Sequence, residues 1–169
     1  MRKIQQKCSA CLAKERSVPA RRGVHVPRVT GNVGEKTYID LVGFSNTPRG
    51  NKNILTVMDG FSRYACAYPI PNKEARTVAK ALMEQHIPQH GVPLHIHSDN
   101  GLEFVNKLWV ELLQMLNIKH TTTPPYNPSS NAVERWHRTL GSILRTMPAD
   151  MQRDWDLSLG MAVFAYNTT

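Results

Sequence analysis

Three short apolar segments, joined by brief polar connections, restrict the first half of this chain to an antiparallel β-meander. The segments are TYIDLVGF (37–44), NILTVMD (53–59) and RYACAYPI (63–70), all rich in residues that favour strands. The Asp59-Gly60 pair that ends the second segment favours a turn. Short loops can join antiparallel strands, whereas parallel strands need a long crossover. We therefore predict that the three strands pair in sequence order.

Helical and strand-like segments alternate along the rest of the chain. Apolar residues spaced three or four apart indicate four helices, and β-branched runs between them indicate two further strands. This order predicts an α/β fold, a mixed five-stranded sheet flanked by helices. The further strands are expected at 93–98 and 118–123, and the residues expected to be buried on the helices are Ala75, Val78, Ala79, Leu82 and Met83, then Phe104, Leu108, Leu112, Met115 and Leu116, then Val133, Trp136, Leu140, Ile143 and Leu144, and finally Trp155, Leu159, Val163 and Phe164.

The positive charge is concentrated at the start of the chain. The whole chain carries a formal charge of +8, and residues 1–36 contain nine basic and two acidic residues, which is +7 of that total. A basic arm joined to a nearly neutral body is typical of proteins that bind a polyanion, most often a nucleic acid. A solubilising tail is the alternative interpretation.

Nothing in the sequence indicates a membrane partner. No apolar run approaches the ~20 residues of a membrane span, and the opening residues, MRKIQQKCSACLAKERS, lack the apolar stretch of a signal peptide. We therefore expect an intracellular protein whose three cysteines stay reduced. Cys66 lies within the third predicted strand and is expected to be a core residue.

Three carboxylates stand out against this pattern. Asp40 lies within the first predicted strand, Asp99 follows the fourth, and Glu134 lies on a helix face away from its apolar stripe. Each also has a plainer interpretation: Asp40 as an edge residue, Asp99 as a turn residue before Asn100, and Glu134 as the capping-box partner of Asn131.

A cluster of these carboxylates would repel itself unless cations were bound to it. Oxygen ligands suit Mg²⁺ or Mn²⁺, and two such ions about 4 Å apart activate an attacking oxygen and stabilise a leaving one during phosphoryl transfer. The hypothesis is therefore that Asp40, Asp99 and Glu134 share two divalent ions.

Two motifs, HSDNGLEF (97–104) and PPYNPSSNAVERWHRTL (124–140), resemble the catalytic core of retroviral and gypsy-type LTR-retrotransposon integrases. TYIDLVGF and GNKNILTVMDGFSRYACAYPI resemble the first strands of that core. The resemblance implies an RNase H-like fold and a catalytic triad of two Asp and one Glu, which falls here on Asp40, Asp99 and Glu134. The family usually has one residue more than the 34 found here between the last two.

The shorter spacing falls in the loop before the helix that carries Glu134, so it affects the DNA contacts of that loop more than the triad. Tyr126 and Asn127 of this loop are candidate DNA-binding residues by the resemblance. Arg135 and Arg138 on the helix are expected to contact DNA phosphates, and the alternative is a surface pair between Arg138 and Glu134.

Cys8 and Cys11 resemble the second half of the family's His-His-Cys-Cys zinc module. Two thiolates are half of a tetrahedral site, so zinc is not expected in this fragment. We expect residues 1–35 to form a basic arm and linker with this remnant, and residues 36–169 to form an integrase catalytic core that stops before any C-terminal DNA-binding domain.

The resemblance implies metal-dependent 3′-end processing followed by strand transfer into target DNA, by a nuclear protein that reaches the nucleus through the cytoplasm and forms homo-oligomers. Its partners would be the DNA ends of the element and the target DNA. Two alternatives stay open: an RNase H-type nuclease of the same fold, and an inactive or host-adopted remnant that only binds DNA.

Overall fold

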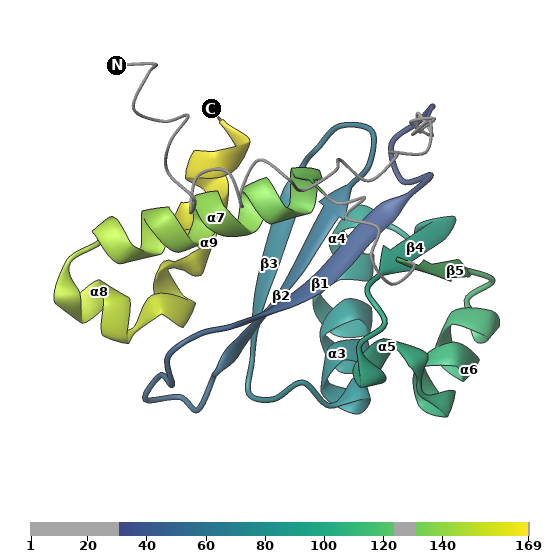
Figure 1. Ribbon diagram of the computed structural model, residues 1–169, viewed down its shortest axis with the longest axis horizontal. Coiled ribbons are helices and arrows are strands. Elements are labelled where there is room, and N and C mark those ends of the chain that lie inside the picture. The colour runs from purple at the N-terminus through teal and green to yellow at the C-terminus, as the bar shows by residue number, and fades with distance from the viewer. Residues whose placement is uncertain (1–30, 124–130, 169) are drawn as a thin grey trace, which may run out of the picture.

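The computed structural model describes residues 31–123 and 131–168, without the side chains at positions 131, 132 and 134. These residues form a five-stranded sheet of spatial order β3-β2-β1-β4-β5, with helices on both faces (Figure 1). The predicted α/β fold with a mixed five-stranded sheet is confirmed. The strands are β1 (Thr37–Gly43), β2 (Asn53–Asp59), β3 (Ala65–Ile70), β4 (His95–Ser98) and β5 (Lys119–Thr122).

The first three strands form the predicted antiparallel meander, and β4 and β5 extend the sheet in parallel on the other side of β1. Helices form the connections to the parallel strands, because such crossovers need length. Before β4 lie α3 (Ala75–Ala81), the π-helical turn η1 (Leu82–His86) and α4 (Ile87–His90), before β5 lie α5 (Leu102–Val105) and α6 (Lys107–Met115), and the chain continues with α7 (Asn131–Thr146), α8 (Ala149–Arg153) and α9 (Trp155–Asn167).

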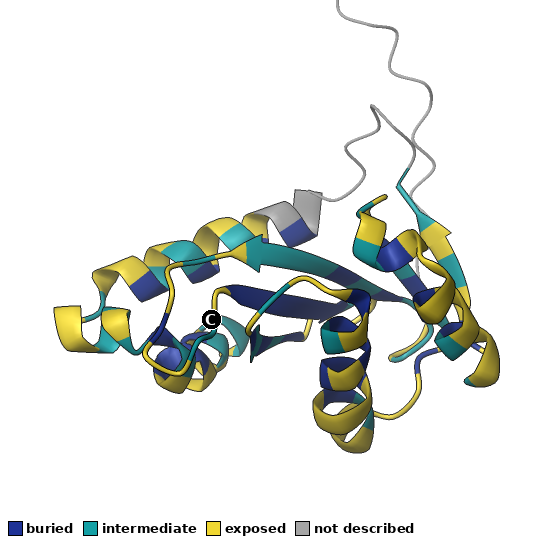
Figure 2. Ribbon diagram, turned by 90° about the horizontal axis from the view of Figure 1, so that it is seen from below, coloured by how far each residue is buried: buried dark blue, intermediate teal, exposed yellow. Residues whose placement is uncertain are grey.

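The sheet separates two hydrophobic cores, and Figure 2 shows the buried residues on the strands and on the helix faces turned toward them. One core lies under α3, α5 and α6, and the other lies under α7 and α9. Ile39 of β1 belongs to the first core, while its neighbour Tyr38 packs against the second. Successive side chains of a strand point to opposite faces, so Asp40 shares the α7 face with Tyr38.

The predicted buried face of the helix before β5 is correct for Phe104, Leu112 and Leu116 and wrong for Leu108 and Met115. A break at Asn106 divides that helix into α5 and α6, and the Asn106 side chain accepts a hydrogen bond of 3.1 Å from Trp109 N. The second helix therefore turns Trp109 and Leu113 toward the sheet. Leu108 and Met115, which were predicted to be buried, are 43% and 85% exposed.

Two more predicted core residues, Met83 and Phe164, are also exposed. Met83 lies in the π-helical turn, whose wider spiral changes which residues follow Leu82 onto the buried face. α9 buries Trp155, Leu159 and Ala162 instead, and Phe164 falls outside that stripe.

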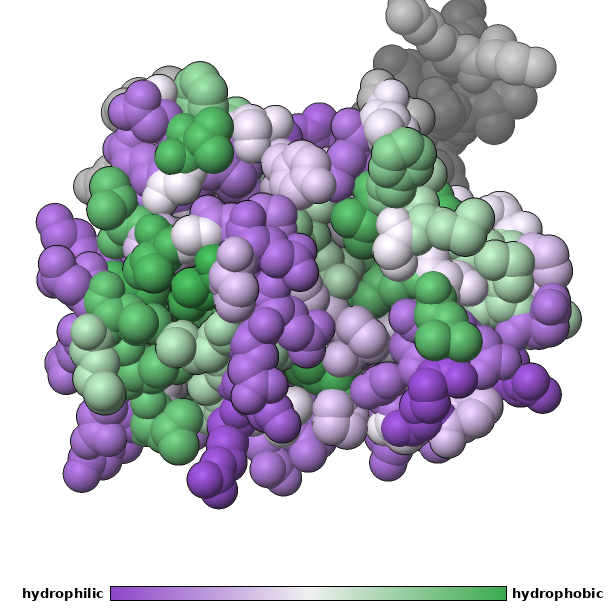
Figure 3. Space-filling model, turned by 180° about the vertical axis from the view of Figure 1, so that it is seen from behind, coloured by the Kyte–Doolittle hydropathy of each residue, from purple (hydrophilic) through white to green (hydrophobic). Residues whose placement is uncertain are grey.

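Figure 3 shows hydrophobic side chains gathered on the half of the molecule that carries α3 and α6. Among the described residues, no helix has the length and apolar character needed to cross a bilayer.

Hydrogen bonds attach both ends of α9 to the sheet region. At its start, Trp155 Nε1 donates to the Ser45 carbonyl at 2.7 Å. At its end, the Asn167 amide forms two bonds with the backbone of Ala65, accepting from its N–H at 2.9 Å and donating to its carbonyl at 2.8 Å. These bonds hold α9 against β3. They thereby also fix one side of the core that lies under α7.

Candidate active site

Asp40 lies in the middle of β1 and turns its carboxylate toward α7. Its Oδ2 lies 3.7 Å from Nδ1 of His137 on that helix, and its Oδ1 accepts a hydrogen bond of 2.7 Å from Leu41 N. The side chain is 34% exposed. Because side chains alternate between the two faces of β1, the partly accessible Asp40 carboxylate lies on the face where Glu134 was expected.

The register between β1 and β4 brings Asp99 beside Asp40. Tyr38 pairs with His97 in this parallel ladder. Asp40 and Asp99 each follow two residues later, so the two-residue period sends both to the same end and the same face of the sheet. Neighbouring strands are about 4.8 Å apart, which makes the two carboxylates neighbours.

The turn after β4 holds Asp99 in place. Its Oδ1 accepts a hydrogen bond of 2.9 Å from Gly101 N, and the Asn100 side chain donates to the Thr123 carbonyl at 2.9 Å. The interpretation of Asp99 as a turn residue is therefore also correct. A Cβ on Gly101 would meet the Glu103 carboxylate at 2.8 Å and Asp99 Oδ1 at 3.0 Å, so a larger residue there would displace both carboxylates.

The electrostatic surroundings of Asp40 resist its ionisation. Burial is the largest influence, and the pKa of Asp40 is raised to about 6. The Leu41 N–H lowers the pKa, the carboxylates of Asp99 and Glu103 raise it, and Lys73 lowers it. A carboxyl group whose pKa is raised and that lies beside a second carboxylate is a candidate functional group, and two adjacent carboxylates can share a cation.

Glu134, the third predicted member, lies on α7 directly after Val133. Asp40, Asp99 and Val133 line one small pocket of about 40 Å³. The backbone of α7 therefore brings the position of Glu134 to the edge of the pocket that the two aspartates line. The side chain of Glu134 lies outside the described part of the chain, so its membership of the site stays a prediction.

The remaining predicted site residues are described only in part. Arg135 and Arg138 are exposed on α7, next to the pocket end of the helix. Their DNA contacts stay predictions. Outside the described residues lie Tyr126, Asn127, Cys8 and Cys11.

Sequence reasoning missed two residues near this pocket. Glu103 contributes to the field at Asp40, and His137 contacts its carboxylate. Both had a signal in the sequence, because Glu103 lies within the HSDNGLEF motif and His137 follows Glu134 by three residues, close to one helical turn.

Comparison with known proteins places this geometry in a family. Residues 32–128 match the family model of the integrase core domain, a stretch that contains Asp40 and Asp99 and ends before Glu134. The retrovirus-related Pol polyprotein from transposon 412 of Drosophila melanogaster is 34% identical over 137 residues, which are 80% of this chain and 11% of the polyprotein. The chain thus spans about a tenth of that relative's length.

Two solved structures share the fold. The catalytic core domain of BIV integrase is 32% identical with a TM-score of 0.61, and the match covers 77% of this chain and 81% of that one. The catalytic core domain of HTLV-2 integrase, a dimeric form in complex with magnesium, is 21% identical with a TM-score of 0.58, covering 74% and 84%. The family model covers more than half of this chain and a relative above 30% identity covers four fifths of it, so the chain belongs to the integrase core domain family.

Proposed function

We propose that this chain catalyses DNA integration, in which Asp40, Asp99 and Glu134 carry out 3′-end processing and then strand transfer. The observation that carries the proposal is the parallel register of β1 and β4, which brings Asp40 and Asp99 to one pocket beneath α7. Water would be the first nucleophile and the new 3′-hydroxyl the second. This chemistry needs no covalent intermediate on the protein.

The described residues fit a divalent cation. The donors are carboxylate oxygens, the chemistry that Mg²⁺ and Mn²⁺ prefer. Burial, and to a smaller extent the carboxylate of Asp99, raises the pKa of Asp40, and a bound cation would offset both effects. When bound, a pair of such ions would polarise the scissile phosphate and stabilise the charge that develops on it. Asp40 and Asp99 would hold the ions, and Gly101 N–H keeps the Asp99 carboxylate oriented.

The DNA-binding part of the proposal rests on charge. Arg135 and Arg138 are exposed on the helix that adjoins the pocket, and residues 1–36 carry most of the net charge. At these positions the two guanidinium groups would bind phosphates of the DNA backbone near the pocket. The dimeric form of the HTLV-2 core agrees with a homo-oligomeric assembly, which is part of this proposal for this chain.

The test is strand transfer of a labelled oligonucleotide by the full chain with and without Mg²⁺ or Mn²⁺. Asp99→Asn removes one negative charge with little change of volume, so we expect it to abolish product at every metal concentration. Asp150→Asn, an identical change at an exposed position of α8, is the matched control and should keep full activity.

DNA binding separates this proposal from the remnant that only binds DNA. The Asp99→Asn variant should still bind DNA and keep its melting temperature. If the wild-type chain binds DNA but forms no strand-transfer or end-processing product with either metal, the binding-only alternative is correct and the catalytic proposal is wrong.

A further inference from the structure

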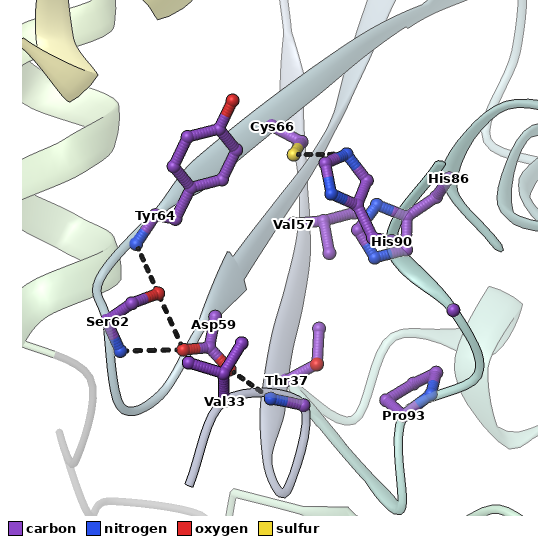
Figure 4. A pocket seen from close by; sticks show the side chains of 12 residues that line it. Val33, Thr37, Val57, Asp59, Ser62, Tyr64, Cys66, His86, His90 and Pro93 are labelled. Atoms are coloured by element: carbon purple, nitrogen blue, oxygen red, sulfur yellow. Dashed lines mark hydrogen bonds between the residues drawn. The ribbon is translucent and has the colours of Figure 1, made fainter. Parts of the chain in front are cut away.

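A second group of ligand-type side chains lies on the other face of the sheet. Cys66 of β3, His86 at the end of η1 and His90 at the end of α4 point toward one another (Figure 4). Their ligand atoms all lie within 4.8 Å of one another. Cys66 belongs to the core under α3 and α6, whereas Asp40 faces α7, so this group is separate from the candidate active site.

The helical segment before β4 has a local feature that brings its two histidines to this place. Ile87 N donates to Leu82 O, five residues back, which is the hydrogen bond of a π-helical turn. Pro88 follows directly and has no N–H to continue an α-helical ladder, which favours the wider turn. His86 and His90 are four residues apart, and their rings stack with centroids 4.7 Å apart. Single π turns are frequent at functional sites.

The contact between Cys66 and His90 has the length found between two ligands of one zinc ion. Cys66 Sγ lies 3.3 Å from His90 Nε2. Ligand atoms of a tetrahedral zinc site are about 3.3–3.7 Å apart, given bonds of about 2.0–2.3 Å. His86 Nδ1 is hydrogen-bonded to the Tyr68 hydroxyl at 2.9 Å, which orients the ring and leaves Nε2 as the ligand nitrogen.

We propose that Cys66, His86 and His90 form a three-ligand zinc site whose fourth position opens into a pocket of about 440 Å³. One thiolate and two neutral imidazoles are the borderline-soft donor set that zinc prefers, and sites with three protein ligands keep a position for water or for a donor from a small molecule. On binding, the Cys66 thiol loses its proton to solvent and the sulfur bonds to the metal. The ion would join β3 to the segment between η1 and β4.

Burial affects the two kinds of ligand differently. Burial lowers the pKa of His86 to about 4, so this ring is neutral at pH 7, as a metal ligand must be. Burial also raises the pKa of the Cys66 thiol, so this group keeps its proton until a metal displaces it, and metal affinity should rise with pH. Asp59, the carboxylate that also lines the pocket, is engaged elsewhere, because it accepts hydrogen bonds from the N–H groups of Gly34 and Ser62.

Cobalt binding tests the site in a background that excludes the other thiols. The full chain carries three cysteines, so Cys8→Ser and Cys11→Ser leave Cys66 as the single thiol. Co²⁺ is titrated into this protein with saturating Mg²⁺ present to occupy the carboxylate site. We expect one Co²⁺ per chain, a thiolate-to-cobalt charge-transfer band, the visible bands of four-coordinate cobalt, and displacement of all of them by Zn²⁺.

Three variants in the same background attribute the bands to these ligands. His90→Gln changes an exposed residue, which protects the fold, and should weaken Co²⁺ and Zn²⁺ binding by more than about tenfold. Tyr68→Phe removes the orienting hydroxyl and should weaken binding about tenfold. His95→Gln, the same change on β4 outside the group, should leave the titration unchanged. A missing thiolate band, or a band that His90→Gln leaves intact, would show that the three residues are only a packed hydrogen-bonding group.

The result is independent of the integrase proposal. Metal binding at Cys66 is read from absorbance and from the melting temperature with and without Zn²⁺, neither of which needs strand-transfer activity. If the chain binds cobalt through its thiol but transfers no DNA, the zinc-site proposal stands and the catalytic proposal is wrong. If it transfers DNA but binds no cobalt through its thiol, the catalytic proposal stands and the zinc-site proposal is wrong.

Discussion

His137 connects the helix of the candidate site with its central strand. Its Nε2 is hydrogen-bonded to Thr56 Oγ1 at 2.8 Å, and Thr56 in turn donates to the Asp40 carbonyl at 3.0 Å. The 3.7 Å separation between His137 Nδ1 and Asp40 Oδ2 is too long for a hydrogen bond. Burial lowers the pKa of His137, so the ring is neutral at pH 7 and acts by position rather than by charge.

Replacing His137 with Ala should therefore affect activity through the geometry of Asp40. We expect strand transfer to fall by about 10-fold, the size of effect that supporting residues around metal ligands have. The metal concentration for half-maximal activity should rise with it. His137→Gln, whose amide can still reach Thr56, should recover most of the loss. Equal effects of both variants on melting temperature, with no change in metal dependence, would point to a purely structural role.

Site residues could be predicted from the sequence where the neighbouring residues along the chain are enough to mark them. Asp40 within an apolar strand and Asp99 at a strand end are visible in the pattern, because a charge in such a place needs a partner. Their neighbours Glu103 and His137 were missed, since their contribution depends on how α5 and α7 approach β1. The pairing of Cys66 with two histidines was missed for the same reason, although its burial was predicted correctly.

The helices that cross the sheet depend on single residues at their ends. Asn106 ends one short helix and caps the next, where its side chain accepts the N–H of Trp109. Trp109 is fully buried against Phe104 and Leu113. The cap therefore fixes the rotation at which α6 meets the sheet.

Asn106→Ala should lower the free energy of unfolding by about 1 kcal/mol, the usual cost of losing an N-cap side chain. Urea denaturation measures this change. Gln114→Ala, at an exposed position of the same helix, is the control and should change stability by less than about 0.5 kcal/mol. If Asn106→Ala lowers stability no more than the control does, the packing of Trp109 alone determines the position of α6.

This cap also explains why Leu108 and Met115 were wrongly predicted to be buried. A continuous pattern over 101–116 satisfies an amphipathic helix with Leu108 and Met115 inside. Breaking the helix at Asn106 restarts the 3.6-residue period, and the larger Trp109 then occupies the core. The strand order was predictable because it follows from connection lengths, which a local break does not alter.

At the scale of the whole molecule, a buried and a half-buried histidine make folding sensitive to acid. Burial lowers the pKa of His86 and of His97 to about 4, below the ordinary value of 6.5. The unfolded chain then binds protons more readily than the folded one between these values, so stability falls as pH drops from about 6.5 to about 4. Asp40 acts in the opposite direction, because its raised pKa of about 6 destabilises the fold as pH rises from about 4 to about 6.

Burial also lowers the pKa values of His120 and His137, so these histidines outnumber Asp40 and we expect a net loss of stability toward acid. Urea unfolding at about pH 7 and about pH 4.5 should show the loss, and His97→Gln should reduce it. Asp40→Asn removes the opposing group, so it should steepen the loss. Stability that rises steadily toward pH 4.5 would contradict the neutral state assigned to the histidines.

The basic arm gives a prediction at the same scale. A chain that starts at Gly31 loses eight of the nine basic residues of 1–36 and keeps Lys36. We expect it to bind DNA more weakly at low salt and with a shallower dependence on salt between about 50 and 200 mM. Its melting temperature should not change. A lower melting temperature with an unaltered salt slope would show that the arm packs on the core instead.

The pair of hydrogen bonds between Asn167 and Ala65 bears on solubility. β3 is an outer strand of the described sheet, and an outer strand offers N–H and C=O groups that another molecule's strand can join. The Asn167 amide imitates a strand partner and occupies both groups of Ala65. Asn167→Ala would expose them, so concentrated solutions of this variant should scatter more light than those of Thr168→Ala. The last turn of α9 would then prevent the protein from polymerising through the edge of its sheet.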